Sequence, residues 1–600
     1  MKLQLFAALT VVCLPLLSRG VAADFQNEVR TLASDRSTLA SAYELPWSIT
    51  RSERFERLYR EWQQRLAQTD FEALNQAGRI DYILLRNEIT SDLGDLVVQK
   101  ARLKEMEELL SFRSAIQELE EARWQMGPVD PQMAATKIAE VAERVKKLKE
   151  RVEKGQKSKD EKKPDKTNET TAATAPEVPK GSKDKPEDGP LKISPALARR
   201  ASSAINDVRA TLETWYSFYD GYQPDFSWWM KKPYEEVGTA LKSYAKYLRE
   251  EVAELKGKDE DPLLGEVLGR EALLRNLETE MIAFTPEELT AIGEKEFAWC
   301  EAEMKKAARE MGLDDWKQAI AKVKSDFVQP GQQDELVGKC AREAIEFVKT
   351  RDLATIPPMC EEVWRLKMIS SEGQKTLPYA AYGGQSVMVA YAKDEMKQED
   401  KLMAMRGNNR HFTRIVTAHE LIPGHHLQHF AAARNRDYRG MFSTPFFVEG
   451  WALYWEIRLW DLQYARTPEE RIGMLFWRMH RCARIIVSLK FHLGQMQPKE
   501  MVEFLVERVG HEKLGATSEV RRFISGGYSP LYQCGYMIGG LQLDALRKEV
   551  TGGGKMSEKQ FNDAVLTYGP VPIEVIRAGL LNLPLARDTK AAWRFYNLRT

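Results

Sequence analysis

Five of the eight histidines in this 600-residue chain lie within nineteen residues, at His411, His419, His425, His426 and His429. The stretch 419–426 reads HELIPGHH. In the H-E-x-x-H signature of zinc hydrolases, two histidines on one helix face bind the metal and the glutamate reaches the metal-bound water. Here a proline stands in place of the second histidine. These residues alone are compatible with a zinc site that has a lengthened turn, or with a histidine-rich helix end that binds no metal.

A straight helix cannot make this zinc site. His426 would lie about 10.5 Å along the helix axis from His419, whereas two imidazoles on one zinc ion bring their nitrogens within about 3–3.5 Å. Pro423 removes a backbone donor, and Gly424 can take backbone angles closed to other residues. We therefore expect a bulge that returns either His425 or His426 to the metal. His425 is favoured because it needs the shorter insertion.

The third metal ligand is expected on a following helix. The segment 447–456, FVEGWALYWE, is almost wholly apolar except for Glu449 and Glu456. A lone buried carboxylate is costly unless it is paired or bound to a metal. Glu449 lies 24 residues after His425, which leaves room for a helix, a turn and a return. We expect Glu449 to bind the metal and Glu456, on the same helix face, to support a ligand.

The rest of the chain is predicted to be mainly helical. Apolar residues at helical spacing mark 54–66, 103–119, 133–152, 234–255, 285–309 and 336–349, and a helix is expected to start at Pro195 with Ser194 as its N-cap. The segment 386–391, SVMVAY, is the clearest strand. It is either an ordinary sheet strand or an edge strand that holds a peptide beside the zinc helix.

The composition changes sharply between 153 and 191, where Lys, Asp, Glu, Pro, Thr and Gly replace the large apolar residues. Such a segment cannot offset its ordering entropy, so we predict a disordered insertion inside one helical region. The expected organisation is a signal segment at 1–23, a helical region at 24–152, this insertion at 153–191, and a helical region at 192–600 with the zinc site at 419–449.

The first residues are typical of an export signal. Lys2 precedes a short apolar stretch at 3–17, and the small residues at 21–23 form a cleavage site. The stretch is shorter than the ~20 residues that span a bilayer, and no later stretch is long and apolar enough to do so. Cys13 follows two valines, which make a poor lipid-attachment motif. We expect soluble export, to the periplasm or the medium.

Charge and cysteine usage argue against nucleic-acid binding, a disulfide framework and a cysteine zinc site. Lys plus Arg equals Asp plus Glu at 88 each, which gives no support for nucleic-acid binding through bulk charge. The cysteines after the signal are scattered, odd in number and without C-x-x-C spacing, so neither a disulfide framework nor a cysteine zinc site is expected. They are Cys300, Cys340, Cys360, Cys482 and Cys534.

Two motifs carry a family resemblance. The sequence HELIPGHHLQ at 419–428, followed by EGWALY at 449–454, resembles the bacterial family known as domain of unknown function 885. Weaker likeness extends to 79–85, 519–523 and 530–539. The resemblance implies a mostly helical fold like that of zinc metallopeptidases of the glutamate-zincin clan, a small sheet near the active site, and a peptide or peptide-like substrate.

The chain departs from the pattern of this family in two places. Ser488 stands where the family usually has an aspartate, a few residues before a histidine that is His492 here. Further along, Pro530-Leu531-Tyr532 replaces a Pro-Gly-Gln run. Both departures bear on the substrate pocket.

The mechanism that these residues suggest is hydrolysis by an activated water. Zn²⁺ held by His419, His425 and Glu449 would lower the pKa of a bound water toward about 7. Glu420 would take the proton of this water and return it to the leaving amine.

The developing oxyanion needs a further hydrogen-bond donor. Tyr536 is the first candidate and His492 the second, followed by Tyr528 and Tyr532. The predicted function is thus an exported zinc-dependent peptidase. The alternative is a catalytically silent peptide- or ligand-binding protein that keeps the fold. The intact His419-Glu420 pair favours the enzyme, and Ser488 is the main point for the alternative.

Overall fold

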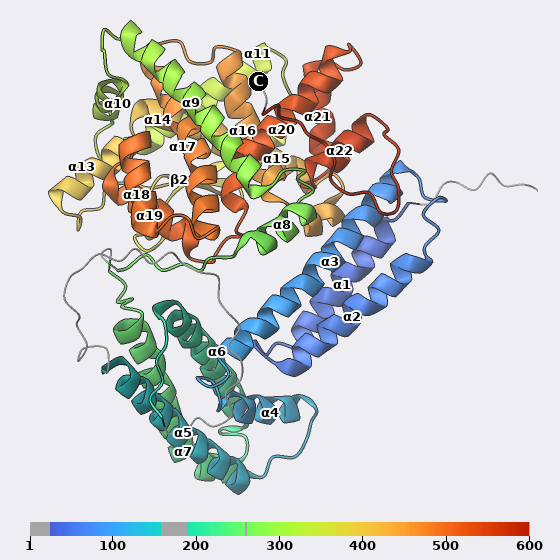
Figure 1. Ribbon diagram of the computed structural model, residues 1–600, viewed down its shortest axis with the longest axis vertical. Coiled ribbons are helices and arrows are strands. Elements are labelled where there is room, and N and C mark those ends of the chain that lie inside the picture. Colours follow the sequence, from blue (N-terminus) through green and yellow to red (C-terminus); the bar gives the residue numbers. More distant parts are fainter. Residues whose placement is uncertain (1–23, 158–188, 259–260, 599–600) are drawn as a thin grey trace, which may run out of the picture.

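The computed structural model describes residues 24–157, 189–258 and 261–598. Within these residues the protein is mainly helical, with 22 α-helices and one three-stranded sheet, so the predicted fold class is confirmed. The expected signal segment and most of the expected 153–191 insertion lie outside the described residues. Figure 1 shows three parts: helices α1–α3 along one side, helices α4–α7 in a lower lobe, and a larger body above.

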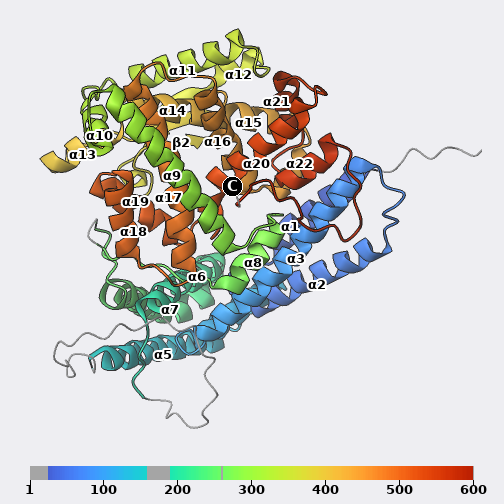
Figure 2. The same ribbon diagram turned by 45° about the horizontal axis from the view of Figure 1, so that its top comes forward.

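The three N-terminal helices pack side by side along the edge of the larger body (Figures 1 and 2): α1 (Gln26–Ala42), α2 (Ile49–Gln68) and α3 (Gln76–Glu105). Leu58, Trp62 and Leu66 share one face of α2 at helical spacing and are buried. The helix predicted at 54–66 is therefore confirmed. On α3, Asp81 accepts a hydrogen bond from Arg439 of the larger body at 2.8 Å, in a fully buried ion pair.

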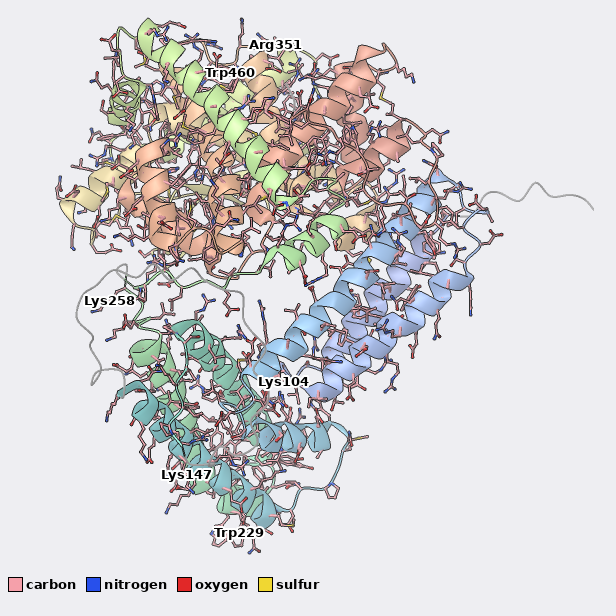
Figure 3. All side chains as sticks on the ribbon, in the orientation of Figure 1. Lys104, Lys147, Trp229, Lys258, Arg351 and Trp460 are labelled. Atoms are coloured by element: carbon pink, nitrogen blue, oxygen red, sulfur yellow. The ribbon has the colours of Figure 1, made fainter. Side chains whose placement is uncertain are left out.

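The lower lobe has its own hydrophobic core, built around Ile138, Trp215 and Tyr244. Its helices are α4 (Arg113–Trp124), α5 (Pro131–Lys157), α6 (Pro195–Tyr219) and α7 (Pro224–Tyr247), and a π-helical turn, Leu248–Val252, follows α7. Figure 3 shows Trp229 at the outer end of this lobe, far from Trp460 on the larger body.

The sequence predicted where helices start better than it predicted whether they continue without a break. The hydroxyl of Ser194 accepts from the backbone N–H of Leu197 at the start of α6, and Thr285 with Glu288 forms a capping box at the start of α9 (Pro286–Glu310). The single helix predicted at 103–119 is wrong, because α3 ends at Glu105 and α4 begins only at residue 113. Residues 106–112 form turns that still bury apolar side chains in the core of the lobe, which explains the misleading pattern.

The larger body contains the remaining helices. They are α8 (Arg270–Thr279), α9, α10 (Trp316–Ser325), α11 (Gln333–Thr350), α12 (Pro358–Val363), α13 (Gln398–Gly407), α14 (Arg410–Glu420), α15 (His425–Ala432), α16 (Pro445–Asp461), α17 (Pro468–His492), α18 (Pro498–Phe504), α19 (Lys513–Ile524), α20 (Tyr532–Gly552), α21 (Glu558–Thr567) and α22 (Ile573–Leu580). Shorter turns are the 3₁₀ segments Gly373–Lys375 and Asp437–Phe442 and the π segment Leu505–Val509.

Helices α16 and α20 cross at unusually close range because glycines line their contact. A Cβ added at Gly539 would lie 1.9 Å from the carbonyl oxygen of Phe446, and one added at Gly450 would lie 2.7 Å from the Cα of Gly539. Any larger residue at either glycine would push the helices apart. This contact sets Glu449, beside Gly450, against the first turns of α20.

The sheet is small and mixed. Its strands are β1 (Arg365–Met368), β2 (Ala380–Gly383) and β3 (Ser386–Val389), in the order β1-β3-β2. β1 pairs with β3 in parallel, and β2 pairs with β3 antiparallel. The strand predicted at 386–391 is therefore present over 386–389, as the central strand. The edge strand β2 was not predicted.

All five cysteines in the described part of the chain are free and buried, in agreement with the absence of a disulfide framework. No helix in the described ranges combines the length and the apolarity needed to cross a membrane.

Candidate metal centre

A four-residue turn joins the two helices that carry the histidines. Helix α14 ends at Glu420 and α15 begins at His425. The backbone N–H of Gly424 donates to the carbonyl of Ala418 at 3.0 Å, which folds the turn back onto α14. A Cβ at Gly424 would lie 1.8 Å from the carbonyl oxygen of His419, so the turn requires glycine. The bulge expected from the Pro-Gly pair is present, with Gly424 at φ −79° and ψ −130°.

Helix α16 holds this turn and also carries the carboxylate of the site. The indole Nε1 of Trp451 donates to the carbonyl of Pro423 at 2.9 Å, and both residues are buried. Glu449 lies two residues earlier on the same helix. One rigid element therefore positions both the histidine turn and the glutamate.

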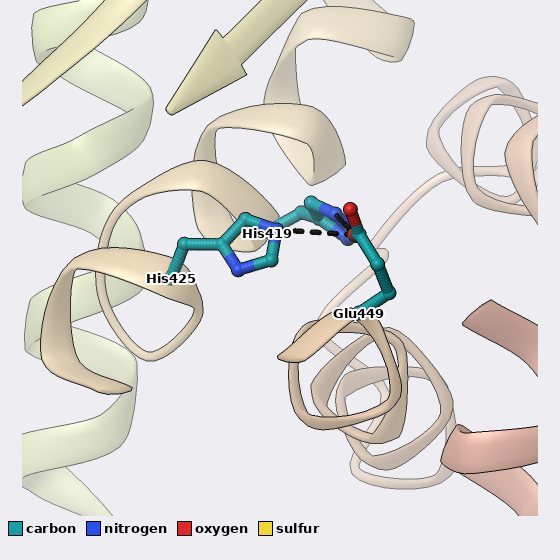
Figure 4. A group of neighbouring side chains, drawn as sticks. All are labelled: His419, His425 and Glu449. Atoms are coloured by element: carbon teal, nitrogen blue, oxygen red, sulfur yellow. Dashed lines mark ion pairs between the residues drawn. The ribbon is translucent and has the colours of Figure 1, made fainter. Parts of the chain in front are cut away.

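His419, His425 and Glu449 converge (Figure 4). Nε2 of His425 lies 3.2 Å from Oε2 of Glu449, and Nε2 of His419 lies 3.5 Å from the same oxygen. The two imidazole rings are nearly perpendicular, at 89°, with centroids 4.8 Å apart. One donor atom of each residue lies within 4.8 Å of the other two. Within the described ranges, this is the one group of three or more such side chains placed to hold a metal ion.

Neighbouring side chains fix the orientation of these groups. Nδ1 of His419 donates to Oε1 of Glu456 at 2.7 Å, as expected for a supporting carboxylate. Arg481 donates to the same oxygen at 3.3 Å, and the hydroxyl of Tyr532 donates to Oε1 of Glu449. The bond to Glu456 holds a proton on Nδ1 of His419, so Nε2 is the nitrogen that would bind a metal.

The electrostatics of the group suit a cation. Burial alone would lower the pKa of His419, but the nearby carboxylates of Glu449 and Glu456 raise it to about 9. Burial alone would raise the pKa of Glu449, but His425 and His419 hold it well below its ordinary range. The buried Oε2 of Glu449 has no hydrogen-bond partner. Two imidazoles and one such carboxylate are a donor set that catalytic zinc takes, so the residues present fit that kind of ion.

The other histidines of the cluster lie outside this group. His426 donates from Nε2 to a backbone carbonyl in α12 at 2.8 Å, and its Nδ1 accepts from the hydroxyl of Tyr382 at 3.2 Å. Both its ring nitrogens are therefore engaged, and His425 is the residue that faces Glu449. His429 stacks on Tyr382 with ring centroids 5.0 Å apart, and His411 contacts Asp326 at 3.0 Å.

A cavity of about 270 Å³ opens onto the group. Strand β2 and the residues just before it form one side of it, and residues of α14, α15, α16, α17, α19 and α20 form most of the rest. Glu420, next to His419 in the chain, lines the cavity and is mostly buried. The strand beside the site is thus the edge strand β2, whereas the predicted strand β3 lies behind it and contributes only Met388.

Three tyrosines predicted near the site also line this cavity: Tyr528, Tyr532 and Tyr536. The ring of Tyr536 lies almost parallel to that of His419, at 13°, with centroids 6.1 Å apart. Burial raises the pKa of Tyr536 to about 12, so its hydroxyl keeps its proton at neutral pH. The hydroxyl of Tyr532 is already hydrogen-bonded to Glu449.

His492, predicted as the second candidate for the oxyanion donor, does not line the cavity. It ends α17, where its carbonyl accepts from the backbone N–H of Gly269 at 2.9 Å. Arg481 and Arg484 occupy the part of α17 that faces the cavity, and His492 lies about two turns beyond them. Ser488 also lies outside the cavity lining, with a buried hydroxyl that has no hydrogen-bond partner.

The sequence interpretation missed a second polar group on this cavity. Arg484 on α17 and Arg522 on α19 both donate to Oε2 of Glu519, at 2.7 and 3.1 Å, and all three residues line the cavity. A signal was available: Arg478, Arg481 and Arg484 interrupt the mainly apolar run 472–489 at a spacing of three residues. Charged residues at such positions are buried only when they are paired.

The fold and the site together define a mainly helical protein with a candidate metal centre at the wall of a cavity. Its sequence places it more narrowly. The chain belongs to a family of bacterial proteins of unknown function, DUF885, whose sequence profile matches residues 44–580. No curated protein matches the chain.

A solved structure shares this fold. A proposed lipoprotein of unknown function from Shewanella oneidensis superposes with a TM-score of 0.64 at 16% identity, over 93% of this chain and 100% of that chain. A second proposed lipoprotein, from Colwellia psychrerythraea, has 17% identity over 65% of this chain and 70% of that chain, with a TM-score of 0.47. The first likeness indicates a shared fold.

Proposed function

We propose that this protein is an exported zinc-dependent peptidase in which His419, His425 and Glu449 hold the metal. The observation that carries the proposal is the buried Oε2 of Glu449, which has no hydrogen bond and lies 3.2 and 3.5 Å from two imidazole Nε2 atoms. A zinc ion bound there would supply Lewis-acid chemistry, by lowering the pKa of a water and polarising a carbonyl group. Glu456 and Tyr532 orient the ligands through their hydrogen bonds.

Glu420 is the proposed general base. It follows His419 at the end of α14, lines the same cavity and is mostly buried. Its carboxylate takes a proton from the attacking water and returns it to the leaving amine. Tyr536 is the proposed donor to the developing oxyanion, since it lines the cavity beside His419 with its hydroxyl protonated.

The edge strand β2 supports a peptide substrate. It pairs with β3 on one side only, and Ala380 and Ala381 line the cavity. An extended peptide can add to such an edge through main-chain hydrogen bonds. Export is supported by the signal pattern at 1–23 and by the description of the Shewanella protein as a proposed lipoprotein.

The test is the variant Glu420→Gln, with the surface variant Glu399→Gln on α13 as a matched control. We expect Glu420→Gln to retain about one zinc per chain and to lose hydrolysis of a peptide mixture by at least ~10²-fold, the smaller end of what a general base contributes. Glu399→Gln should match the wild type. Metal content is measured by mass spectrometry of the purified protein, and cleavage by mass spectrometry of the peptides.

Three outcomes would contradict the proposal. Full activity in Glu420→Gln would remove Glu420 as the base. Cleavage that persists in a zinc chelator would contradict the metal-dependent mechanism. No cleavage of any peptide by the zinc-loaded protein would favour the alternative of a silent binding protein.

A further inference from the structure

A buried arginine group lies on the cavity that holds the candidate metal centre. We define it as Arg484, Arg522 and Glu519. Both guanidinium groups donate to the same carboxylate oxygen. The side chain of Arg484 is 3% exposed and that of Arg522 is 10% exposed. Arg484 also donates from Nε to Nε2 of His480 at 2.9 Å.

This group carries more positive than negative charge. Two guanidinium groups share one carboxylate, and burial together with the charge of Arg484 lowers the pKa of His480 to about 3, which keeps that ring neutral. Nη1 of Arg484 and Nε of Arg522 are buried and have no hydrogen-bond partner. An unbalanced buried cation with unused donors is costly unless an anion completes it.

We propose that the arginine group binds the C-terminal carboxylate of a peptide, so that the enzyme removes residues from the C-terminal end of its substrates. This inference rests on the proposed peptidase function. The guanidinium fork matches a planar carboxylate with paired, charge-assisted hydrogen bonds. A peptide N-terminus is a poor fit, because the Glu519 carboxylate that would attract it already accepts from both arginines.

The position of the group relative to the metal centre determines where the peptide is cut. The guanidinium carbon of Arg484 lies 4.3 Å from the ring centroid of Tyr536, and His419 stacks on that ring at 6.1 Å. About one aromatic ring therefore separates the two sites. The cavity of about 270 Å³ is small for a ligand pocket. Only one or two residues fit between the bound carboxylate and the scissile bond.

The reaction is ordinary hydrolysis at that bond. The oxygen of one water bonds to the carbonyl carbon and the C–N bond breaks. One water proton passes through Glu420 to the leaving amine. The products are a shortened peptide with a new C-terminal carboxylate and a free amino acid or dipeptide.

The test compares N-acetylated hexapeptides that have a free C-terminal carboxylate with the same peptides as C-terminal amides, half of each set lacking Asp and Glu. The zinc-loaded wild type should cut the free acids one or two residues from the C-terminus, with kcat/KM about tenfold or more above the amides. Mass spectrometry reads both the rate and the position of the cut. Equal rates for acids and amides, or cutting of amides beside an internal Asp or Glu, would overturn the proposal while leaving the peptidase intact.

Variants assign the effect to the arginine group. Arg522→Gln should bring the acid-to-amide ratio close to one, chiefly through KM, and Arg522→Lys should retain part of the preference because it keeps the charge without the fork. Arg521→Gln, the preceding residue on α19 but outside the cavity lining, should keep the wild-type ratio. An unchanged ratio in a folded Arg522→Gln protein would contradict the assignment.

Failure of the parent proposal can be told apart from failure of this one. If the zinc-loaded protein cuts neither set, calorimetry on the Glu420→Gln variant still tests the carboxylate site. It measures how tightly N-acetylated tripeptides bind as free acids and as amides. Binding of the acid about tenfold or more tighter than the amide, lost on adding Arg522→Gln, supports the site without catalysis. Equal binding of acid and amide overturns it.

Discussion

His419 and His480 are both buried beside a glutamate in the same part of the larger body, yet their surroundings shift their pKa values in opposite directions. His419 contacts two carboxylates, Glu449 and Glu456, which raise its pKa to about 9 against the effect of burial. Burial and the charge of Arg484 lower the pKa of His480 to about 3. The sign of the nearest charged partner, and not burial, separates the two histidines.

The two histidine groups also differ in what their ring nitrogens do. In the metal group, the Nε2 atoms of His419 and His425 meet at an oxygen of Glu449 that has no hydrogen bond. In the second group, Nε2 of His480 accepts from Arg484. Its Nδ1 therefore carries the proton and donates to Nε2 of His511 at 2.9 Å. His511 in turn donates from Nδ1 to the hydroxyl of Tyr379 at 2.8 Å.

This difference explains why buried histidines and glutamates are not by themselves a metal site. The second group uses every ring nitrogen in a hydrogen-bonded chain, so no lone pair remains for a metal. The first group uses only one nitrogen of His419 and leaves a convergent pair. What identifies the candidate centre is therefore the unused donor atoms.

The largest effect that tests this comparison is the loss of a ligand. His425→Ala should lower zinc affinity roughly a hundredfold or more, because structural sites gain about 10–16 kcal/mol from four ligands. His426→Ala removes the adjacent histidine, whose nitrogens bond to Tyr382 and a backbone carbonyl, and should retain about one zinc per chain. Zinc content after dialysis against a weak chelator measures both variants.

The reverse result would identify His426, and not His425, as the metal ligand. Zinc retained in His425→Ala and lost in His426→Ala would show that the turn rearranges when metal binds. Circular dichroism of both variants checks that each protein is folded, so that loss of metal is not loss of structure.

A smaller effect is expected from a supporting carboxylate. Glu456→Gln keeps the shape of the side chain but weakens the bond that orients His419, and such changes typically cost 10- to 100-fold in metal affinity. His511→Gln, in the second group, should leave zinc affinity unchanged. Competition with a fluorescent zinc chelator reads both. Equal affinities in the two variants would mean that Glu456 does not position His419.

The metal group could be predicted because each of its members stands out within a short stretch of sequence. His419 and Glu420 lie in a short motif, and Glu449 is one of two carboxylates in the apolar segment 447–456. The choice between His425 and His426 depended on the turn. Only the structure shows that Gly424 packs directly on the backbone of α14, which fixes the histidine that returns.

The arginine group could not be predicted in the same way, because its charges balance only across the fold. Arg484 lies on α17, and its partners Glu519 and Arg522 lie 35 and 38 residues later in the sequence. Along the chain, the arginines of α17 indicate only that a buried charge needs a partner, and not which residue supplies it. Strand β2 was missed for a related reason. Its four residues, Ala380–Gly383, show no clear alternation, and the strand exists through its pairing with β3.

The smallest effect concerns the pH dependence of stability. Burial, followed by neighbouring positive charge, lowers the pKa of His480 to about 3, and burial followed by His480 lowers the pKa of His511 well below its ordinary value. In the unfolded chain both titrate near pH 6.5. As the pH falls below about 6.5, the unfolded chain takes up protons that the folded protein does not. The free energy of unfolding therefore falls by about 1.4 kcal/mol per pH unit for each histidine.

Replacing one of these histidines should reduce by one the number of protons that the unfolded chain takes up in excess of the folded protein. Between pH 6 and pH 5, the unfolding free energy of metal-free His511→Gln should fall less steeply than that of the metal-free wild type, by about 1.4 kcal/mol per pH unit at most. Urea denaturation at each pH measures the slope, which is independent of any overall loss of stability from the substitution. An identical slope would mean that His511 takes up its proton in the folded protein. The second group would then hold charge as the metal group does, and the contrast between the two would not stand.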